Sequence, residues 1–464
     1  MRNGAWNVGN SLNAYFASLK DKRILVLGIG VSNRPLVRML LEQGLDVTAC
    51  DRMPRESLDA EILTLEAMGA RLKLGDDYLD DLQGDVVFRT PGMHPENPAL
   101  QKLRQQGAEI TSEMEVFFSH CPCKIIAVTG SDGKTTTTTL IAEILRHAGK
   151  TVYLGGNIGQ PLLPMTEQME EDDFAVVELS SFQLMTMKKS AHVAVVTNLA
   201  PNHLDVHKDM QEYVSAKKNI FLYQNPADKL IVNGDNAITN GFASLAAGRV
   251  EKFSRQTRLE QGCCLHDDTV YLDGRALLNR QDIRLPGLHN VENYMAAICA
   301  TRDFVSDEDV LAVARNFAGV EHRIEFVREY RGMKIYNDSI ASSPSRTTAG
   351  LRAFDQRVIL IAGGYDKKIP FDELGVEICD HVKALILCGA TGEKIKNAVI
   401  SAPNYHGQLP IITVSALKDA VDAAVEQGRA GDVITLSPAC AAFDQFKNFM
   451  VRGKTFKKLV MELE

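Results

Sequence analysis

Short hydrophobic runs alternate with amphipathic segments along most of the chain. Residues 24–27 (ILVL) form one such run, a helical pattern follows, and a second strand is expected at 46–50. Later runs, such as FAVVEL at 174–179 and RVILIAGG at 357–364, also end in polar or glycine residues. Strands that alternate with helices favour parallel sheets with right-handed crossovers. The pattern therefore predicts an α/β fold whose functional groups gather at the carboxyl edges of the sheets.

The length of the chain predicts more than one hydrophobic core. At 464 residues it corresponds to about three domains of ordinary size. We expect a Rossmann-like N-terminal domain over 1–112, a central domain over 113–319 and a Rossmann-like C-terminal domain over 320–464. Within the central domain, residues 230–286 have the pattern of shorter, turn-rich strands.

Composition narrows the class of protein. The net charge of −8 argues against a nucleic-acid surface, which is normally basic. No apolar run approaches the roughly 20 residues needed to cross a bilayer, and the first residues lack the apolar core of a signal peptide. Nine cysteines are scattered without a disulfide-like or zinc-knuckle spacing, which indicates reduced thiols. These features favour a cytoplasmic enzyme that acts on a small molecule, with no nucleic-acid partner and no membrane insertion.

The segment TGSDGKTT has the composition of a phosphate-binding loop. Gly130 and Gly133 let the backbone curl with its N–H groups pointing inward at a helix N-terminus. Lys134 can then reach the phosphates of a nucleotide, and the Thr135 hydroxyl can bind Mg²⁺. Val128 stands where the usual pattern has its first glycine, so the loop is short. These roles need only the Gly-Lys-Thr spacing, and we expect a central sheet like that of P-loop ATPases.

The first strand–helix–strand unit contains an incomplete dinucleotide fingerprint. Gly28 and Gly30 follow the first strand, and Asp51 ends the second at the spacing of a ribose contact. Asn33 and its neighbours stand where a third glycine would be expected. This favours a nucleotide-fold domain for a ligand other than NAD at least as much as one for NAD.

Two further side chains stand at successive strand ends of the central unit. Glu178 ends the run FAVVE, and His203 follows the next run in TNLAPNHLD. Because both strand ends lie at one edge of a parallel sheet, the two side chains are expected to join the phosphate loop as metal ligands.

Seven motifs in order carry a family resemblance: TGSDGKTT, ELSSFQL, TNLAPNHLDVH, LPGLHNVENYMAA, EHRIEF, YNDS and SPACAAFDQFKNF. They resemble the Mur ligases, ATP-dependent amide-forming enzymes of peptidoglycan precursor synthesis. Within that family the match is to the members that add D-glutamate to UDP-MurNAc-L-Ala through an acyl phosphate. The resemblance implies ATP, two Mg²⁺ ions and a monomeric enzyme, with the UDP-sugar, ATP and the amino acid bound by the first, second and third domain.

The resemblance also implies residue roles, position by position. The ATP-binding residues would be Gly130, Ser131, Asp132, Gly133, Lys134, Thr135, Thr136, Asn290, Asn293, Arg323 and Asp338. The metal ligands would be Thr135, Glu178, His203 and a carbamylated Lys217, and the UDP-sugar ligands Val31, Ser32, Asp51 and Asn157. Lys134, His203 and Lys217 would be catalytic. A carbamate has physical sense because an ammonium repels Mg²⁺ whereas a CO₂ adduct presents a carboxylate, but the adjacent Lys218 leaves the register open.

The amino-acid pocket departs from the family pattern. Many relatives have a lysine after NDS, where this chain has Ile340, and a serine at Ala442. The candidates for this pocket are Ser342, Lys367, Ala442, Phe443 and Phe449. The changes leave open whether the amino acid is D-glutamate or L-glutamate.

Other functions explain less of the sequence. An NAD-dependent oxidoreductase would account for Gly28, Gly30 and Asp51 but would leave the phosphate loop without a role. A non-enzymatic ATP-binding scaffold is compatible with the altered pocket. The diaminopimelate- or lysine-adding ligases are disfavoured because no Asp-Asn-Pro-Arg motif occurs.

Overall fold

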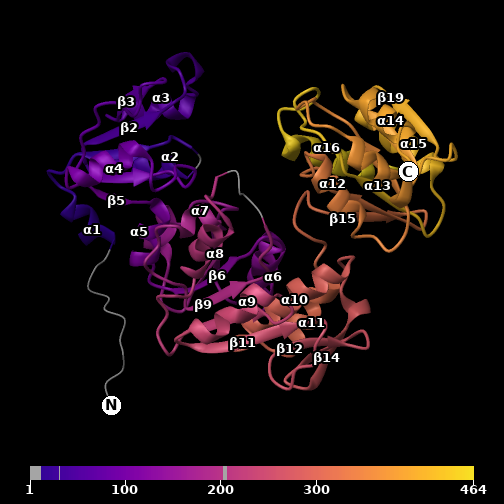
Figure 1. Cartoon of the computed structure of the whole chain (residues 1–464), viewed down its shortest axis with the longest axis horizontal. Coiled ribbons are helices and arrows are strands. Elements are labelled where there is room, and N and C mark those ends of the chain that lie inside the picture. The colour runs from indigo at the N-terminus through magenta and orange to yellow at the C-terminus, as the bar shows by residue number, and fades with distance from the viewer. Residues whose placement is uncertain (1–11, 31, 202–205) are drawn as a thin grey trace. The chain divides into compact units, whose positions relative to one another are not determined.

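The computed structural model describes residues 12–30, 32–201 and 206–464, and three β-sheets organise them (Figure 1). These residues divide into two compact units. One holds the chain up to Asn279 together with Glu292–Val313, and the other holds Arg280–Val291 with Ala314–Glu464. The first unit contains two of the sheets and the second unit contains the third. The predicted α/β fold built on three sheets is confirmed.

The first sheet has the strand order β3-β2-β1-β4-β5 in the described part of the chain, and all its strands are parallel. The strands are β1 (Ile24–Leu27), β2 (Val47–Asp51), β3 (Arg71–Leu74), β4 (Val86–Arg89) and β5 (Glu109–Thr111). The helices are α1 (Leu12–Ser18), α2 (Asn33–Glu42), η1 (Arg55–Ser57), α3 (Ala60–Ala67) and α4 (Pro98–Gln105). The strand order reverses between β1 and β4, which is where Rossmann-like sheets bind their ligands.

The central sheet is the largest described, with the order β14-β13-β12-β11-β10-β9-β6-β8-β7. Its parallel strands are β6 (Lys124–Thr129), β7 (Val152–Gly156), β8 (Phe174–Glu178), β9 (Val193–Val196), β10 (Lys229–Asn233), β11 (Arg249–Ser254) and β12 (Cys263–His266). Two antiparallel strands, β13 (Thr269–Leu272) and β14 (Arg275–Asn279), close one edge. The turn-rich segment expected near residues 230–286 corresponds to β10–β14.

The helical elements of this part of the chain follow the same order. They are α5 (Glu113–His120), α6 (Lys134–His147), η2 (Leu163–Gln168), α7 (Ser181–Leu184), α8 (Met210–Lys218), α9 (Ala237–Gly241), η3 (Phe242–Leu245), η4 (Arg280–Asp282), α10 (Leu288–Thr301) and α11 (Asp307–Asn316). In the threonine run that opens α6, two of the hydroxyls bond back to the main chain of the helix. Thr138 donates to the carbonyl of Lys134, and Thr139 donates to that of Thr135.

The third sheet belongs to the second unit and has the order β15-β16-β20-β17-β18-β19 among described residues. Its strands are β15 (Glu325–Tyr330), β16 (Met333–Asn337), β17 (Val358–Ala362), β18 (Val382–Cys388), β19 (Ile411–Val414) and β20 (Val433–Leu436), and only β15 runs antiparallel to its neighbour. The helices are α12 (Pro344–Leu351), α13 (Asp372–His381), α14 (Gly392–Ile400), α15 (Leu417–Gln427) and α16 (Phe449–Met461).

Alternating residues of β17 and β18 point into two separate cores of this unit. Leu360 and Leu385 pack with residues of α12, α13 and α14, whereas Ile361 and Ile386 pack with residues of α15 and α16. Helices therefore cover both faces, as they do in doubly wound sheets. The orange and yellow elements of Figure 1 show this arrangement.

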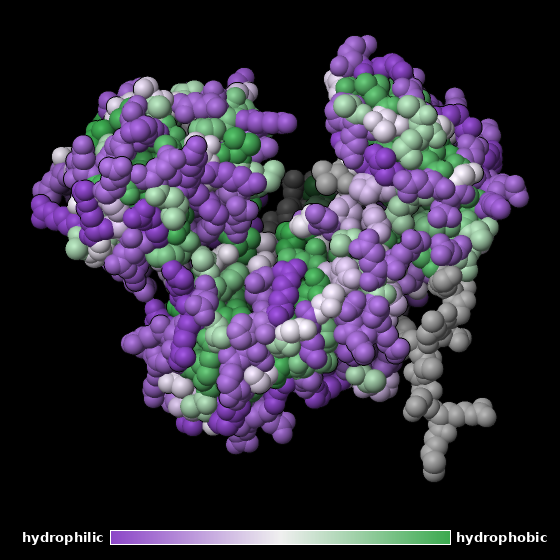
Figure 2. Space-filling view, turned by 180° about the vertical axis from the view of Figure 1, so that it is seen from behind, coloured by the Kyte–Doolittle hydropathy of each residue, from purple (hydrophilic) through white to green (hydrophobic). Residues whose placement is uncertain are grey.

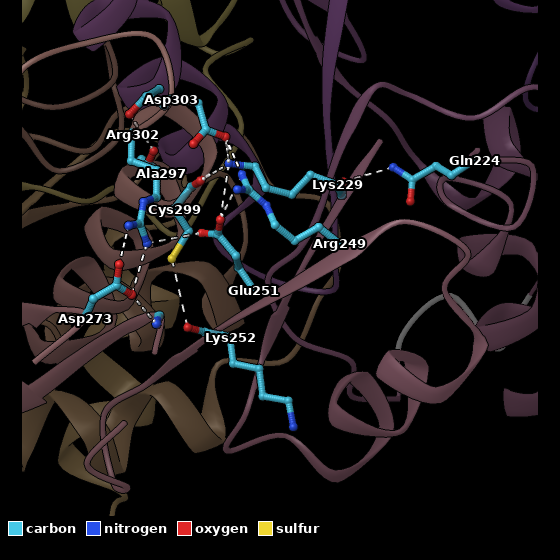
Figure 3. Close-up of polar contacts among 12 residues, drawn as sticks. Gln224, Lys229, Arg249, Glu251, Lys252, Asp273, Ala297, Cys299, Arg302 and Asp303 are labelled. Carbon is cyan, nitrogen blue, oxygen red and sulfur yellow. Dashed lines mark hydrogen bonds and ion pairs between the residues drawn. The ribbon is translucent and has the colours of Figure 1, made fainter. Parts of the chain in front are cut away.

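A chain of ion pairs connects the far strands of the central sheet to the end of α10 (Figure 3). The Lys229 ammonium, only 4% exposed, lies 2.8 Å from the carboxylate of Asp303 and 3.6 Å from that of Glu251. Arg249 pairs with the same two carboxylates. Arg302 extends the chain to Asp273 and, at 3.8 Å, to Glu251. The three cations and three anions of this network balance one another.

On the face drawn in Figure 2, hydrophilic residues cover most of the surface, with smaller hydrophobic groups between them. In the described ranges, no helix has the length and hydropathy of a membrane span.

Candidate active site

The phosphate loop connects β6 to α6 and has the curled backbone that the sequence predicted. Gly130 and Gly133 have positive φ angles of 152° and 77°. A Cβ atom at Gly130 would stand 1.9 Å from Oγ1 of Thr197, and one at Gly133 would stand 2.3 Å from Oδ1 of Asn293. Both backbone conformation and space therefore require glycine at these two positions.

Residues that follow β9 hold the loop. The side-chain oxygen of Asn198 accepts a hydrogen bond from the Asp132 N–H at 3.0 Å, and its main-chain carbonyl accepts one from the Ser131 N–H at 2.9 Å. The Ser131 hydroxyl donates to the carbonyl of Ala200 at 2.9 Å and lies 3.0 Å from the Tyr213 hydroxyl. The loop is thus fixed by long-range contacts from both its main chain and its side chains.

Two lysine side chains meet at one carbonyl of the loop. Lys134 donates to the carbonyls of Gly130 at 3.1 Å and Ser131 at 2.9 Å. Lys217 donates to the same Gly130 carbonyl at 2.9 Å and to the Thr129 hydroxyl at 3.0 Å. Burial, followed by the neighbouring positive charge of Lys134, lowers the pKa of Lys217 well below its ordinary value. Lys217, which is 1% exposed, therefore becomes neutral more readily than an ordinary lysine does.

Glu178 ends β8 with a carboxylate that is almost fully buried. Oε1 accepts a hydrogen bond of 2.7 Å from Nδ2 of Asn157. Oε2 is buried without a hydrogen-bond partner. The Asn157 N–H also donates to the Glu178 carbonyl at 2.8 Å. Asn157, expected from the sequence as a UDP-sugar ligand, therefore also orients Glu178, while one carboxylate oxygen stays available for a cation.

The described donor set fits a Mg²⁺ site that relies on its substrate for ligands. Across residues 12–30, 32–201 and 206–464, no group of three or more His, Cys, Asp or Glu side chains is arranged to hold a metal ion. His203 lies outside these ranges. The available groups are the orphaned oxygen of Glu178 and the hydroxyl of Thr135 in the first turn of α6. One carboxylate with phosphate oxygens and water suits Mg²⁺, which is seldom held by an all-protein cage.

A histidine that the sequence reasoning missed ties α7 to α8. The His207 ring stacks on Phe182 with ring centres 5.2 Å apart. Its Nε2 lies 2.9 Å from the Ser181 hydroxyl, and its Nδ1 lies 3.4 Å from the carboxylate of Glu212. Because α7 follows Glu178 and α8 carries Lys217, these contacts position two candidate site residues. The nearby Tyr213 could have been found from its spacing, four residues before Lys217 on one helix face.

The two asparagines of α10 have different surroundings. Asn293 accepts a hydrogen bond of 3.2 Å from the Thr137 hydroxyl and lies against Gly133 of the phosphate loop. Asn290 donates to the Pro286 carbonyl at 2.6 Å. The structure thus places Asn293 at the loop itself and Asn290 at the turn that precedes α10.

Arg323, in the second unit, lies between two strained residues. His322 has a φ of 66° and Ile324 a φ of 43°, which is rare for a β-branched residue. Asp338 accepts hydrogen bonds from the Ile324 N–H at 3.3 Å and from the Ser437 hydroxyl at 2.7 Å. Burial raises the pKa of Asp338 to about 7. Such strain costs about 1–3 kcal/mol per residue and is typical of functional sites. The hydrogen bond from the Ile324 N–H to Asp338 helps to hold this backbone next to Arg323.

At the first sheet, Asp51 shapes the loops at the switch point. Its carboxylate accepts hydrogen bonds from the Ile29 N–H at 2.6 Å and from the Met53 N–H at 2.9 Å. Ser32 precedes α2 as its N-cap residue without a side-chain capping bond. Val31, the other residue expected near the UDP group, lies outside the described residues.

Several amino-acid-pocket candidates lie at strand ends of the third sheet. Nζ of Lys367 donates to the Ser342 carbonyl at 3.3 Å, so these two are in contact. Ala442 is buried, whereas Phe443 is 63% exposed and meets the ring of Tyr365 edge-on at 5.9 Å. The pocket candidates thus differ widely in exposure.

Phe449 begins α16 near Arg452, a buried cation that the sequence reasoning missed. The Phe449 carbonyl accepts a hydrogen bond of 2.8 Å from the Ser339 hydroxyl. Arg452 donates to that hydroxyl at 3.0 Å and to the carbonyls of Cys440 at 3.0 Å and Ala441 at 3.2 Å. Burial lowers the pKa of Arg452 to about 10. Arg452 therefore joins the NDS and SPACA motifs, which are far apart in sequence.

Known proteins are similar in sequence to this chain over nearly its whole length. A ligase named UDP-N-acetylmuramoylalanine--D-glutamate ligase from Clostridium novyi is 51% identical over 98% of this chain and 99% of its own. One of the same name from Acetivibrio thermocellus is 51% identical over 98% of this chain and 100% of its own.

Solved structures of lower identity share the fold. The UDP-N-acetylmuramate-alanine ligase of Thermotoga maritima has a TM-score of 0.59 at 18% identity, covering 95% of this chain and 99% of its own. A UDP-N-acetylmuramoyl-L-alanyl-D-glutamate--2,6-diaminopimelate ligase has a TM-score of 0.57 at 16% identity, covering 95% of this chain and 93% of its own. The Mur ligase middle domain matches residues 128–301, and the Mur ligase glutamate ligase domain matches residues 322–440. With near-full-length relatives at half identity and both domains matched in order, the chain belongs to the Mur ligase family.

Proposed function

We propose that this chain joins the amine of D-glutamate to the alanine carboxyl of UDP-N-acetylmuramoyl-L-alanine, and that ATP is converted to ADP and phosphate. Its relatives at 51% identity carry the name of that activity. The observation that carries the proposal is the meeting of Lys134 and Lys217 at the Gly130 carbonyl. This places two lysine amines where a nucleotide phosphate would enter the loop.

The reaction needs activation rather than a protein nucleophile. A carboxylate and an ammonium form a stable ion pair at neutral pH, and oxide is a poor leaving group. Transfer of the γ-phosphoryl group of ATP to the alanine carboxylate gives an acyl phosphate. Attack by the neutral amine of glutamate then releases phosphate from a tetrahedral intermediate. Both steps depend mainly on positioning and on neutralising charge.

The phosphate loop would supply most of that neutralisation. Its curled backbone directs N–H groups toward an anion, and Lys134 is already held above it by two loop carbonyls. We assign Gly130, Ser131, Asp132, Gly133, Thr135 and Thr136 to the same nucleotide, with Asn290 and Asn293 of α10 and with Arg323 and Asp338 of the second unit.

A carbamate on Lys217 would provide a second carboxylate beside Glu178. CO₂ reacts with a neutral amine, and the depressed pKa of Lys217 favours that form. Glu178, Thr135, His203 and the carbamate would then hold two Mg²⁺ ions, which supply positive charge against the phosphate oxygens. The orphaned Glu178 oxygen supports this assignment.

The remaining assignments follow the three sheets. Residues 1–112 would bind the UDP-sugar through Val31, Ser32 and Asp51, and Asn157 of the central domain would also contact it. The domain of residues 113–319 would bind ATP, and the domain of residues 320–464 would bind the amino acid. In the last region we assign Ser342, Lys367, Ala442, Phe443 and Phe449 to glutamate. We further infer a cytoplasmic monomer, since its substrates are soluble nucleotides and an amino acid.

Phosphate release tests the proposal. ATP should yield phosphate only when UDP-N-acetylmuramoyl-L-alanine and D-glutamate are both present, and L-glutamate should replace D-glutamate poorly. With ¹⁸O in the alanine carboxyl, label should appear in the released phosphate, because one carboxyl oxygen leaves with it. Faster turnover with L-glutamate than with D-glutamate would favour the alternative of a related ligase that uses L-glutamate, and unlabelled phosphate would exclude the acyl phosphate.

A further inference from the structure

Three sulfur atoms meet where α5 leads into β6, at the amino-terminal end of this strand, whereas the phosphate loop follows its carboxyl end. Cys121 caps the end of α5, Cys123 directly precedes β6, and Met169 follows η2. The two cysteine sulfurs are 3.5 Å apart, and each lies 3.9 Å from Sδ of Met169. None of the roles proposed above uses this cluster.

The spacing of the sulfurs matches a metal–sulfur coordination triangle. A triangle with sides of 3.5, 3.9 and 3.9 Å has its centre about 2.2 Å from each corner. That distance is close to the roughly 2.3 Å of a metal–thiolate bond. A point equidistant from all three sulfurs thus lies at bonding distance without any movement of the backbone.

The chemistry of the donors selects the kind of ion. Thiolate and thioether ligands together favour soft ions such as Cu(I). Structural zinc sites instead take four Cys or His ligands in tetrahedral geometry, and no such cluster occurs among residues 12–30, 32–201 and 206–464. Two thiolates and one thioether in a triangle suit a three-coordinate monovalent ion.

The cluster is shielded but can be reached from solvent. Cys123 and Met169 are 2% and 6% exposed, whereas Cys121 is only partly buried. Both cysteines border a hollow of about 1760 Å³. The hydrogen bond with the neighbouring Cys123 thiol and burial raise the pKa of Cys121, so this thiol carries a proton at neutral pH. A metal ion must therefore displace that proton to bind.

We propose that Cys121, Cys123 and Met169 form a binding site for one soft monovalent cation, Cu(I) or its analogue Ag(I). Two S–H bonds break and two S–metal bonds form, the Met169 sulfur donates a lone pair as the third ligand, and two protons go to solvent. No change of oxidation state is required. The site is independent of the proposed ligase function.

Titration of the full-length protein with Ag(I) and Cu(I) under anaerobic conditions tests the site. Native mass spectrometry should show one tightly held ion in the wild type in the presence of a competing Cu(I) chelator. The variant C121S/C123S should lose that ion, and M169L should weaken it by roughly tenfold or more. X-ray absorption should report three sulfurs at about 2.2–2.3 Å.

Cys263 and Cys264 provide a matched control. These two buried cysteines are adjacent in the sequence and are not part of the Cys121, Cys123 and Met169 cluster. The variant C264S should therefore bind Cu(I) as the wild type does. M169L guards against misfolding, since Leu and Met differ little in volume and such swaps usually cost little stability. Equal retention of the ion by wild type and C121S/C123S would overturn the proposal. A loss of 2 Da in place of bound metal would also overturn it, because the pair would then be a disulfide.

Discussion

At the scale of single residues, the adjacent lysines 217 and 218 have opposite surroundings. Lys217 is buried and bonded to Thr129 and Gly130 of the phosphate loop. Lys218 is partly exposed, with its ammonium 5.6 Å from the ring centre of Phe242. The sequence alone left the register between them open, and in the structure it is Lys217 that contacts the phosphate loop.

Replacement of each lysine separates the two roles. Lys217→Ala should lower kcat at least roughly hundredfold, as expected when a preorganised charge is lost. Short carboxylates such as formate should restore part of the activity by occupying the place of the carbamate. Lys218→Ala should stay within about twofold of wild type, because an exposed cation–π contact is worth only about 0.5–1 kcal/mol. Full activity of Lys217→Ala in a coupled phosphate assay would rule out the carbamate.

The buried carboxyl of Glu113 predicts a pH-dependent stability. Burial raises the pKa of Glu113 to about 7, and its Oε1 accepts a hydrogen bond from the Leu163 N–H at 3.0 Å. The folded state then binds the proton more tightly than the unfolded state, so this contribution is full below the unfolded pKa and is lost as pH rises through about 7.

Glu113→Gln replaces the carboxyl group with an amide that does not ionise but still offers an acceptor oxygen to the Leu163 N–H. The variant should therefore match the wild type in stability near pH 4 and exceed it near pH 8, by at most about 3 kcal/mol. Thermal unfolding at both pH values measures this difference. A variant that loses stability equally at both would show that Glu113 acts only through packing.

At the scale of elements, alanine substitutions of two glycines that flank α6, Gly133 before it and Gly149 after it, should differ in their effect on catalysis. Gly133 and Gly149 have φ angles of 77° and 74°, but only Gly133 has a neighbour in the way of a Cβ atom. Alanine at either position should cost about 1–2 kcal/mol for the left-handed backbone. Only Gly133→Ala should also lower kcat/KM for ATP, by roughly tenfold or more, because it displaces Asn293. Equal kinetics of the two variants would contradict this account of the loop.

The ion-pair network of β10, β11 and α10 should contribute to stability far more than surface pairs do. Lys229→Met leaves the carboxylates of Asp303 and Glu251 short of a buried partner, a loss that typically costs about 3–5 kcal/mol. The Tm should fall on the order of 10 °C. Lys418→Met, which removes an exposed pair with Asp422, should change stability by less than about 1 kcal/mol. A similar small shift for both variants would show that the network is not needed for stability.

The elements were more predictable than the contacts between them. Buried runs such as 125–128 read directly as strands, because central strands of parallel sheets are hydrophobic on both faces. The phosphate loop was also predictable, because the Gly-Lys-Thr spacing is a pattern of neighbouring residues. Asn198, Tyr213 and His207 were missed because they reach the site through tertiary packing between β9, α7 and α8, which has no local pattern. Asn157 was expected at the sugar, and its bond to Glu178 became visible only from the pairing of β7 with β8.

At the scale of the whole molecule, separate sheets carry the expected sites for separate ligands. Asp51 lies at the carboxyl edge of the first sheet, where it organises two loop N–H groups. Lys134 lies at the phosphate loop of the central sheet. If each ligand is bound mainly by its own sheet, then binding of the UDP-sugar and of ATP should be separable by mutation.

Lys134→Ala and Asp51→Ala test that separation in opposite directions. Lys134→Ala should lower turnover at least roughly hundredfold, since the loss of phosphate charge is not replaced. The same variant should hold UDP-N-acetylmuramoyl-L-alanine within about twofold of the wild-type Kd by calorimetry. Asp51→Ala should weaken the UDP-sugar on the order of tenfold, because the Ile29 and Met53 N–H groups lose their acceptor, while a non-hydrolysable ATP analogue binds normally. If Lys134→Ala instead lost the UDP-sugar, the first sheet could not be the principal site of that substrate.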